Sequence, residues 1–195
     1  MAEDLRVIKT RENIQSHFIS LLNDYPFQDI TIQMLITNCK INRSTFYRNY
    51  KDKYDLLEKI SNDLLENYKK TIHPEVISLH PDLSQNLRMH LSPLVDFFDQ
   101  NREILLALDK NYIPFPLFDN MREVMKSVFL KELYASYPIK EMEKAAYYLS
   151  IITSNILTTM KWWHSVCPEL SKQQVLDVLV TCITKGVFFS MKELI

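Results

Sequence analysis

The stretch NRSTFYRNYKDKYDLL, residues 42–57, combines aromatic side chains with two arginines and two lysines and contains neither glycine nor proline. At about 100° per residue, a helix in this stretch places Phe46 and Tyr50 on one side, opposite Ser44 and Arg48. The spacing therefore predicts a short helix with one side in the core and a polar, cationic outer side.

A second short helix is expected directly before it, over residues 32–39. Thr31 is placed to cap its start, and the turn Lys40-Ile41-Asn42 leads into the next helix, over 43–49. The apolar stripe of the helix over 32–39 is formed by Ile32, Leu35, Ile36 and Cys39. Two short helices joined by a tight turn are the arrangement that brings the second helix into the major groove of DNA.

Basic residues are concentrated in this segment. Residues 31–53 carry five cations and one anion, whereas the whole chain has 23 Lys and Arg against 24 Asp and Glu. Binding to a polyanion would therefore depend on this local cluster, as phosphate neutralisation requires. On pattern alone, an ordinary solvated basic helix remains the alternative.

The composition predicts an all-α fold in a cytoplasmic protein. The chain has one glycine in 195 residues, too few for the hairpins and corners of sheets. No apolar run is long enough to span a bilayer, so no membrane partner is expected, and the polar start lacks the apolar core of a signal peptide. The three cysteines are widely spaced, as is typical of reduced thiols.

The block from Thr10 to Leu57 resembles the DNA-binding domain of the TetR/AcrR family of transcriptional regulators. It begins with TRENI, has Tyr25-Pro26-Phe27 before Thr31, and then STFYRNYKDKYDLL, which is similar to the family pattern G-T-x-Y-x-x-F-x-x-K-x-x-L-L. The resemblance implies an amino-terminal helix-turn-helix domain over 1–52 and a helical effector-binding and dimerisation domain over 53–195. It also implies double-stranded DNA as the partner of a homodimer.

The same resemblance assigns roles to single residues. Thr45 and Tyr47 are expected to contact phosphates, and Lys53 to contact the DNA backbone from the next helix. Base edges or nearby phosphates are expected for Gln33, Arg43, Ser44 and Arg48, and Thr31 is also placed among the DNA-binding residues. Arginine can fork onto guanine, whereas hydroxyl groups bind phosphate without reading sequence.

Three positions depart from the family pattern. Lys40 stands where the family has a turn glycine, Ser44 where it has another glycine, and Ile36 where it has alanine. A lysine at positive φ costs about 1 kcal/mol. None of the three changes removes a DNA-contacting group.

Further helices are expected over 10–24, 53–72, 83–100, 102–111, 116–136, 140–166 and 171–193. The first should bury Ile14, Phe18, Leu21, Leu22 and Tyr25, and Pro93 should kink or split the helix over 83–100. The helix over 53–72 is expected to belong to both domains and to transmit movement between them.

The last two of these helices are expected to form a dimeric four-helix bundle, as the resemblance implies, with packing inside one chain as the alternative. Ser171 and Gln174 predict a capping box, and Gly186 inside the last helix would permit close helix approach. The interface candidates are Ile152, Ile156, Trp163, Leu179, Cys182 and Gly186, with Leu149, Met160, Val175 and Phe189 on the same faces.

Soft and aromatic side chains in the middle helices are candidates for a hydrophobic effector pocket, although such residues also form plain core. They are Met89, Phe97, Tyr112, Phe115, Phe118, Met121, Met125, Tyr148 and Trp162. No cofactor, metal site or catalysis is expected. His164 and Cys167 lack a second ligand pair, His73 and His80 flank prolines in a loop, and no glycine-rich phosphate loop exists.

The function predicted from the sequence is that of a TetR-like dimer that represses transcription from a near-palindromic operator and leaves it when a small hydrophobic effector binds. The main alternative is a TetR-like coactivator or adaptor that acts through contacts between proteins. A binding protein for lipid-like ligands is a more distant alternative.

Overall fold

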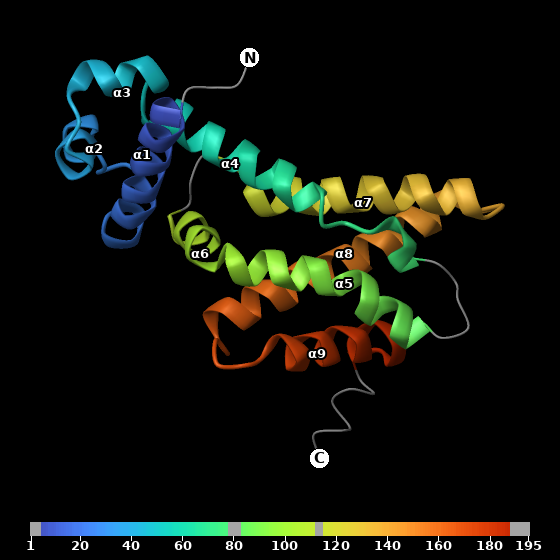
Figure 1. The fold of residues 1–195 in the computed structure, drawn as a ribbon. Coiled ribbons are helices and arrows are strands. Elements are labelled where there is room, and N and C mark those ends of the chain that lie inside the picture. The colour runs from blue at the N-terminus through green and yellow to red at the C-terminus, as the bar shows by residue number, and fades with distance from the viewer. Residues whose placement is uncertain (1–4, 78–82, 112–114, 188–195) are drawn as a thin grey trace. The chain divides into compact units, whose positions relative to one another are not determined.

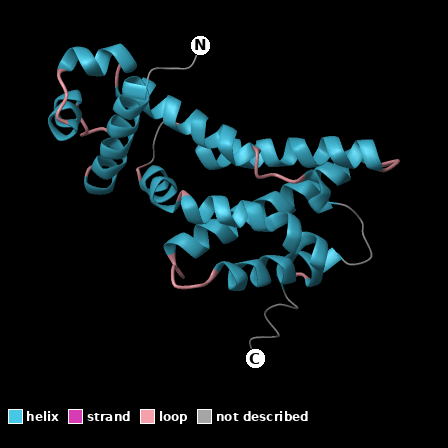
Figure 2. Cartoon of the chain, viewed as in Figure 1, coloured by secondary structure: helices cyan, strands magenta, loops and turns pink. Residues whose placement is uncertain are grey.

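The computed structural model describes residues 5–77, 83–111 and 115–187. These residues form helices joined by short loops and contain no strand (Figures 1 and 2). The expected all-α class is therefore what the described residues adopt. None of the helices within these ranges is long and apolar enough to cross a bilayer.

The first four helices are α1 (Leu5–Asp24), α2 (Ile32–Cys39), α3 (Arg43–Asn49) and α4 (Lys53–Lys69). α2 and α3 have the predicted bounds, whereas α1 begins five residues before position 10 and α4 ends three residues before position 72.

The burial expected for Tyr25 was wrong. This residue follows the end of α1 and its side chain is 46% exposed, because the following Pro26 disfavours helical backbone at position 25. The other four residues of the predicted buried face, Ile14, Phe18, Leu21 and Leu22, are all buried.

The chain divides into two compact units. The first unit contains the chain up to Leu64 together with Glu103–Pro116, and so includes most of α6 (Arg102–Lys110). The second unit contains Leu65–Arg102 and the chain from Leu117 onward. α4 contributes residues to both units, and the functional boundary expected between positions 52 and 53 stays a prediction.

The core of the first unit is aromatic and aliphatic. Phe18, Phe46 and Leu56 have no exposed surface, and they come from α1, α3 and α4. Asn111, just after α6, donates from Nδ2 to the carbonyl oxygens of Leu22 (2.8 Å) and Ala107 (2.7 Å) and accepts the Phe27 N–H at 3.0 Å. These bonds fasten the end of α1 and the turn after it to the end of α6.

The second unit contains a short 3₁₀ helix, η1 (Pro74–Ile77), and four longer helices. They are α5 (Leu83–Gln100), α7 (Leu117–Ser136), α8 (Met142–Ser165) and α9 (Lys172–Lys185). α5 packs against α9, α7 packs against α8, and η1 contacts both α5 and α7. Pro93 does not split α5, which stays one helix and bends along its length (Figure 1).

The helix expected over 171–193 ends at Lys185 in the described part of the chain, and Phe189 lies outside the described residues. Gly186 was predicted to lie inside the helix, but it follows the end of α9. Its φ is 83°, a conformation that glycine adopts without steric cost. The capping box at the start of α9 is confirmed, with Ser171 and Gln174 bonded to each other's backbone.

Candidate functional site

The turn between α2 and α3 is fixed by local hydrogen bonds. Thr31 caps α2, its Oγ1 accepting the Met34 N–H at 3.2 Å, as predicted. Lys40 has φ of 53°, which confirms the expected left-handed residue, and its N–H returns to the carbonyls of Ile36 and Thr37. The strained lysine therefore closes the end of α2 and redirects the chain into α3.

Asn42 organises the start of α3. Its Oδ1 accepts three hydrogen bonds, from the Thr45 N–H (3.1 Å), the Thr45 hydroxyl (2.7 Å) and the Ser44 hydroxyl (2.9 Å). The two hydroxyl groups that the family resemblance assigned to DNA contact are thus held at one end of the helix. Their oxygen lone pairs remain available as acceptors.

The two sides of α3 differ as the spacing predicted. Phe46 is fully buried and Tyr50 is 2% exposed, with ring centroids 5.8 Å apart. Arg43, Ser44, Tyr47 and Arg48 are exposed within the chain, and Thr45 is half-buried. The helix therefore shows its polar side to solvent while its aromatic side anchors it.

Tyr47 is partly ordered by its neighbours on α3. Its ring packs edge-on against Phe46, with centroids 5.6 Å apart, while its outer part stays 46% exposed. Arg43 donates from Nη2 to the Tyr47 hydroxyl at 3.3 Å and lies 5.6 Å from the ring centroid. A cation and a phenol are thereby held together on the exposed side of the helix.

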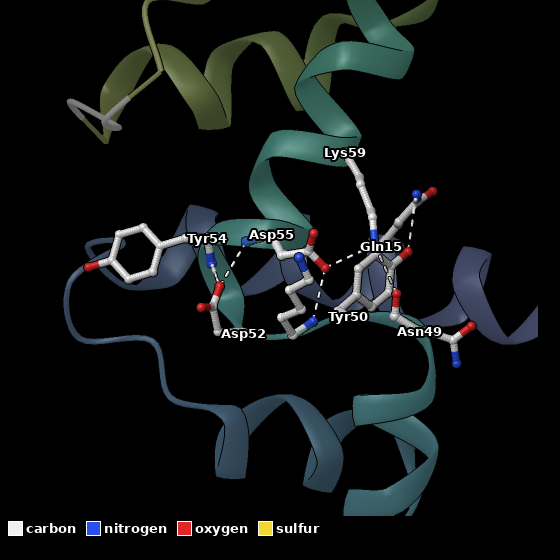
Figure 3. A network of polar contacts seen from close by, with 8 residues as sticks. Gln15, Asn49, Tyr50, Asp52, Tyr54, Asp55 and Lys59 are labelled. Carbon is white, nitrogen blue, oxygen red and sulfur yellow. Dashed lines mark hydrogen bonds and ion pairs between the residues drawn. The ribbon is translucent and has the colours of Figure 1, made fainter.

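A polar network joins the end of α3 to the start of α4 (Figure 3). Lys59 Nζ donates to the Asp55 carboxylate (2.9 Å) and to the Asn49 carbonyl (3.1 Å), and it lies 5.1 Å from the centroid of the Tyr50 ring. Asp55 also accepts the Lys51 N–H at 2.9 Å. Because Asn49 is the last residue of α3, this network fixes the helix against α4.

Two residues of this network, Asp55 and Tyr50, have shifted pKa values. Burial raises the pKa of Asp55, but hydrogen bonds from Lys59 and from the Lys51 N–H outweigh burial and lower it overall. Burial raises the pKa of Tyr50, whose hydroxyl accepts from Gln15 Nε2 at 3.4 Å. The network therefore contains an ionised carboxylate and a neutral phenol at neutral pH.

Asp52 caps the start of α4. Its Oδ1 accepts the N–H groups of Tyr54 and Asp55, each at 2.8 Å (Figure 3). A carboxylate at this end is also favoured by the helix dipole.

Lys53 has an engagement that the sequence did not predict. Its ammonium donates to the carbonyl oxygens of Phe27, Gln28 and Ile30, each at 2.8 Å. Burial lowers the pKa of Lys53, and the nearby charge of Asp29 opposes that shift. All three donors are occupied, so Lys53 holds the turn before α2 against the start of α4.

The remaining residues assigned to DNA lie on the surface. Gln33 is exposed on α2 and donates to the Thr37 hydroxyl at 3.3 Å, and Thr31 is exposed at the start of the same helix. Their contact with DNA stays a prediction. Sequence reasoning missed Lys59 and Asn111, although the spacing of Asp55 and Lys59 is that of an ion pair on one helix face.

The buried thiol of Cys39 is structural. Asn13 Nδ2 donates to the Cys39 carbonyl at 3.0 Å, which fastens α1 to the end of α2. Burial raises the pKa of Cys39 to about 11, so the thiol stays protonated and unreactive at neutral pH.

The second unit contains an apolar cavity of about 380 Å³. Tyr148, one of the predicted effector contacts, lines it. The other lining residues, all aliphatic, are Val76, Ile77, Leu83, Leu87, Leu133, Ile139, Ala145, Leu149, Ile152, Ile156 and Ile183. Helices α5, α7, α8 and α9 and the 3₁₀ helix η1 all contribute to its wall.

The other predicted effector contacts do not line this cavity. Met89 is 63% exposed on α5, Phe97 borders a separate cleft, and Met121 and Met125 are fully buried on α7. The half-buried Phe115, Phe118 and Trp162 are also absent from its lining, and Tyr112 lies outside the described residues.

The predicted interface residues divide into two groups. Ile156, Trp163 and Leu179 are buried inside the single chain, so their side chains offer no surface to a second copy. Ile152 and Cys182 are half-buried, and Gly186 is exposed. The large apolar side chains that α8 and α9 expose are Met142, Tyr147, Tyr148, Ile151 and Val178.

No model of a known protein family matches the sequence, and neither does any curated protein. Among solved structures, the chain is similar to the crystal structure of a TetR transcriptional regulator from Streptococcus agalactiae 2603V, with a TM-score of 0.62 and 23% sequence identity. The likeness covers 91% of this chain and 95% of that one. The predicted fold, a helix-turn-helix part followed by a helical part, is confirmed, and the chain has the fold of a TetR transcriptional regulator.

Proposed function

We propose that this chain is a DNA-binding regulator of transcription of the TetR/AcrR family, which works in the cytoplasm by binding and not by catalysis. It represses from a near-palindromic operator as a homodimer and leaves the DNA when a small hydrophobic effector binds. The observation that carries the proposal is the outward side of α3, where Ser44, Tyr47 and Arg48 are exposed over the buried Phe46.

The exposed groups suit two kinds of DNA contact. Arg43 and Arg48 can donate two parallel hydrogen bonds to guanine, which is worth about 1 to 3 kcal/mol of discrimination. The hydroxyls of Thr45 and Tyr47 bind phosphate and set the register of the helix in the groove. Contact by the Thr45 hydroxyl as a donor requires its release from Asn42, which accepts it at 2.7 Å.

Lys53 contributes mainly by positioning in this proposal. A phosphate contact by its ammonium requires the loss of at least one of the three bonds to the carbonyls of Phe27, Gln28 and Ile30. Lys40 and Lys51 are exposed cations on either side of α3 and supply positive charge without such a cost.

A dimer is needed because one seven-residue helix reads only a few base pairs. Two copies related by twofold symmetry would place their α3 helices about 34 to 36 Å apart, one turn of DNA. For the interface we favour the outward faces of α8 and α9, where Tyr147 (64% exposed), Ile151 (50%) and Val178 (36%) are solvent-exposed within one chain.

The apolar cavity is the proposed effector site. Its volume of about 380 Å³ is within the usual range for small-molecule sites. Among the described lining residues, Tyr148 supplies the one hydroxyl beside aliphatic side chains, so the effector should be small, largely apolar and able to form a hydrogen bond. An effector releases DNA only if it binds the non-binding conformation more tightly.

The DNA-binding proposal is tested with the DNA upstream of the protein's own gene. Fluorescence anisotropy should detect saturable binding to an inverted repeat there, and Arg48→Ala should weaken it roughly 5- to 150-fold. The control Lys131→Ala removes one exposed cation from α7 and should leave affinity unchanged. Equal affinities for wild type and Arg48→Ala would instead favour the adaptor function.

The effector proposal needs a separate test. A library of small apolar compounds is titrated against the complex of protein and operator. Ala145→Phe, which fills the cavity, should abolish release by any active compound, whereas Ala135→Phe on the exposed side of α7 should not. Release that persists in Ala145→Phe would contradict this site.

A further inference from the structure

A group of three metal-ligating side chains lies in the second unit, outside the lining of the apolar cavity. His73 precedes η1, Glu75 is the second residue of η1, and His90 lies on α5. One ligand atom from each comes within 4.8 Å of the others. No other group of three or more such ligands with this proximity occurs among the described residues.

The geometry of this group is near that of a metal site. His73 Nδ1 lies 4.0 Å from Glu75 Oε2, and the rings of His73 and His90 have centroids 5.7 Å apart at an interplanar angle of 43°. Around a zinc ion with bonds of about 2.0 to 2.2 Å, tetrahedral ligand atoms lie roughly 3.4 Å apart. Binding of the ion would therefore draw the three ligand atoms closer together than they lie without it.

The backbone that presents the ligands is held in place without a metal. The Val76 N–H donates to the His73 carbonyl at 3.1 Å, which forms η1, and Val76 is 4% exposed. Asn86 of α5 donates from Nδ2 to the Glu75 carbonyl at 3.0 Å. Because η1 is anchored to α5 in this way, ligation requires ordering of side chains and no rearrangement of the fold.

The ligand set points to a particular class of ion. Two imidazoles and one carboxylate suit zinc and neighbouring divalent transition metals, whereas Mg²⁺ and Ca²⁺ prefer oxygen ligands. The side chains of His73 and Glu75 are 44% and 59% exposed, so an ion can enter from solvent. With three protein ligands, a water molecule would complete a tetrahedral site.

We propose that His73, Glu75 and His90 bind one divalent transition metal ion of the zinc type, which ties η1 to α5. The site adjoins the apolar cavity, because Val76 and Ile77 of η1 are part of the cavity wall. This inference does not rest on DNA binding.

No metal site was expected from the sequence. His73 and His90 are seventeen positions apart and match no metal-binding motif. Only the packing of η1 on α5 brings the two rings together.

The test measures zinc binding by the full chain, freed of any tag and of metal. A chromogenic chelator competes for Zn²⁺, and the wild type should bind one ion per chain. Glu75→Gln should weaken binding on the order of tenfold or more, and the double variant His73→Ala/His90→Ala should abolish it. Saturating Zn²⁺ should raise the Tm of the wild type and not that of the double variant.

Matched controls exclude adventitious binding. Glu66→Gln changes an exposed carboxylate on α4, and His17→Gln removes a histidine from α1. Both should bind Zn²⁺ like the wild type. The proposal is overturned if the wild type binds no Zn²⁺ at micromolar concentrations, or if Glu75→Gln and the double variant bind it as tightly as the wild type.

Discussion

Lys53 Nζ lies 2.8 Å from the carbonyl oxygen of Phe27 and 4.8 Å from the centroid of the Phe27 ring. One ammonium group thus donates a hydrogen bond to a carbonyl oxygen in the turn before α2 and lies over the face of a buried aromatic ring. Since Lys53 is the first residue of α4, this contact connects the turn before α2 with the helix that follows α3.

Lys53→Met should destabilise the fold, because it leaves three carbonyl oxygens without their donor while it keeps most of the aliphatic side chain. We expect the free energy of unfolding to fall by about 2 kcal/mol, measured in urea. Lys51→Met, which changes an exposed lysine two residues earlier, should lie within about 0.5 kcal/mol of the wild type. An equal loss of unfolding free energy in the two variants would show that removal of a positive charge, and not of these three hydrogen bonds, is responsible.

Asn42→Ala should destabilise α3, because it removes the acceptor for the Thr45 N–H and for the hydroxyls of Ser44 and Thr45. The expected loss is about 1 kcal/mol in the free energy of unfolding. Asn62→Ala, at an exposed position of α4, serves as the control. An unchanged midpoint for Asn42→Ala would mean that water replaces the cap at no cost.

Tyr47→Phe and Arg48→Ala should separate phosphate contact from base readout. Removal of the Tyr47 hydroxyl should weaken operator and non-specific DNA by the same factor, on the order of fivefold. Arg48→Ala should weaken the operator more than non-specific DNA, because base contacts carry the specificity. Anisotropy titrations with both DNAs at two salt concentrations measure the ratio of the affinity for the operator to the affinity for non-specific DNA. If Arg48→Ala has the same ratio as the wild type, Arg48 contacts a phosphate and not a base.

Ile151→Glu should shift the protein toward monomers. The residue is 50% exposed on α8, and a carboxylate there would be buried without a partner in the proposed interface. Sedimentation velocity over a range of concentrations measures the shift. Met89→Glu, at a 63% exposed position on α5, should behave like the wild type, and the same dimer fraction in both variants would put the interface elsewhere.

His164 should make stability depend on pH. Burial, with a smaller effect from the positive charge of Arg102, lowers the pKa of His164 to about 4, although Asp99 opposes the shift. The unfolded chain takes up this proton near pH 6.5. The free energy of unfolding should therefore fall between pH 6.5 and pH 4, by at most about 3 kcal/mol.

His164→Gln cannot take up this proton, so its stability should vary less with pH over that range. Urea unfolding at several pH values, for the wild type and the variant, measures the difference between the two slopes. His164 Nε2 is buried and has no hydrogen-bond partner among the described residues, which is consistent with a neutral ring. Parallel curves for the two proteins would contradict the assignment.

The sequence by itself determined the local structure of the first unit. Helical spacing and cap residues predicted α2 and α3 to the residue and the buried pair Phe46 and Tyr50, and the family resemblance implied the left-handed Lys40. These features depend on side-chain periodicity and on hydrogen bonds between near neighbours, which are written directly into the order of residues.

Contacts between residues far apart in the chain were decided only by the tertiary structure. They include the three carbonyls held by Lys53, the apolar cavity and the meeting of His73 with His90. Helical spacing assigns a side chain to a face but does not say which helix covers that face. Ile156 and Leu179 were therefore expected at a dimer interface and are buried inside one chain, because packing among the helices of the second unit determines which apolar faces remain exposed.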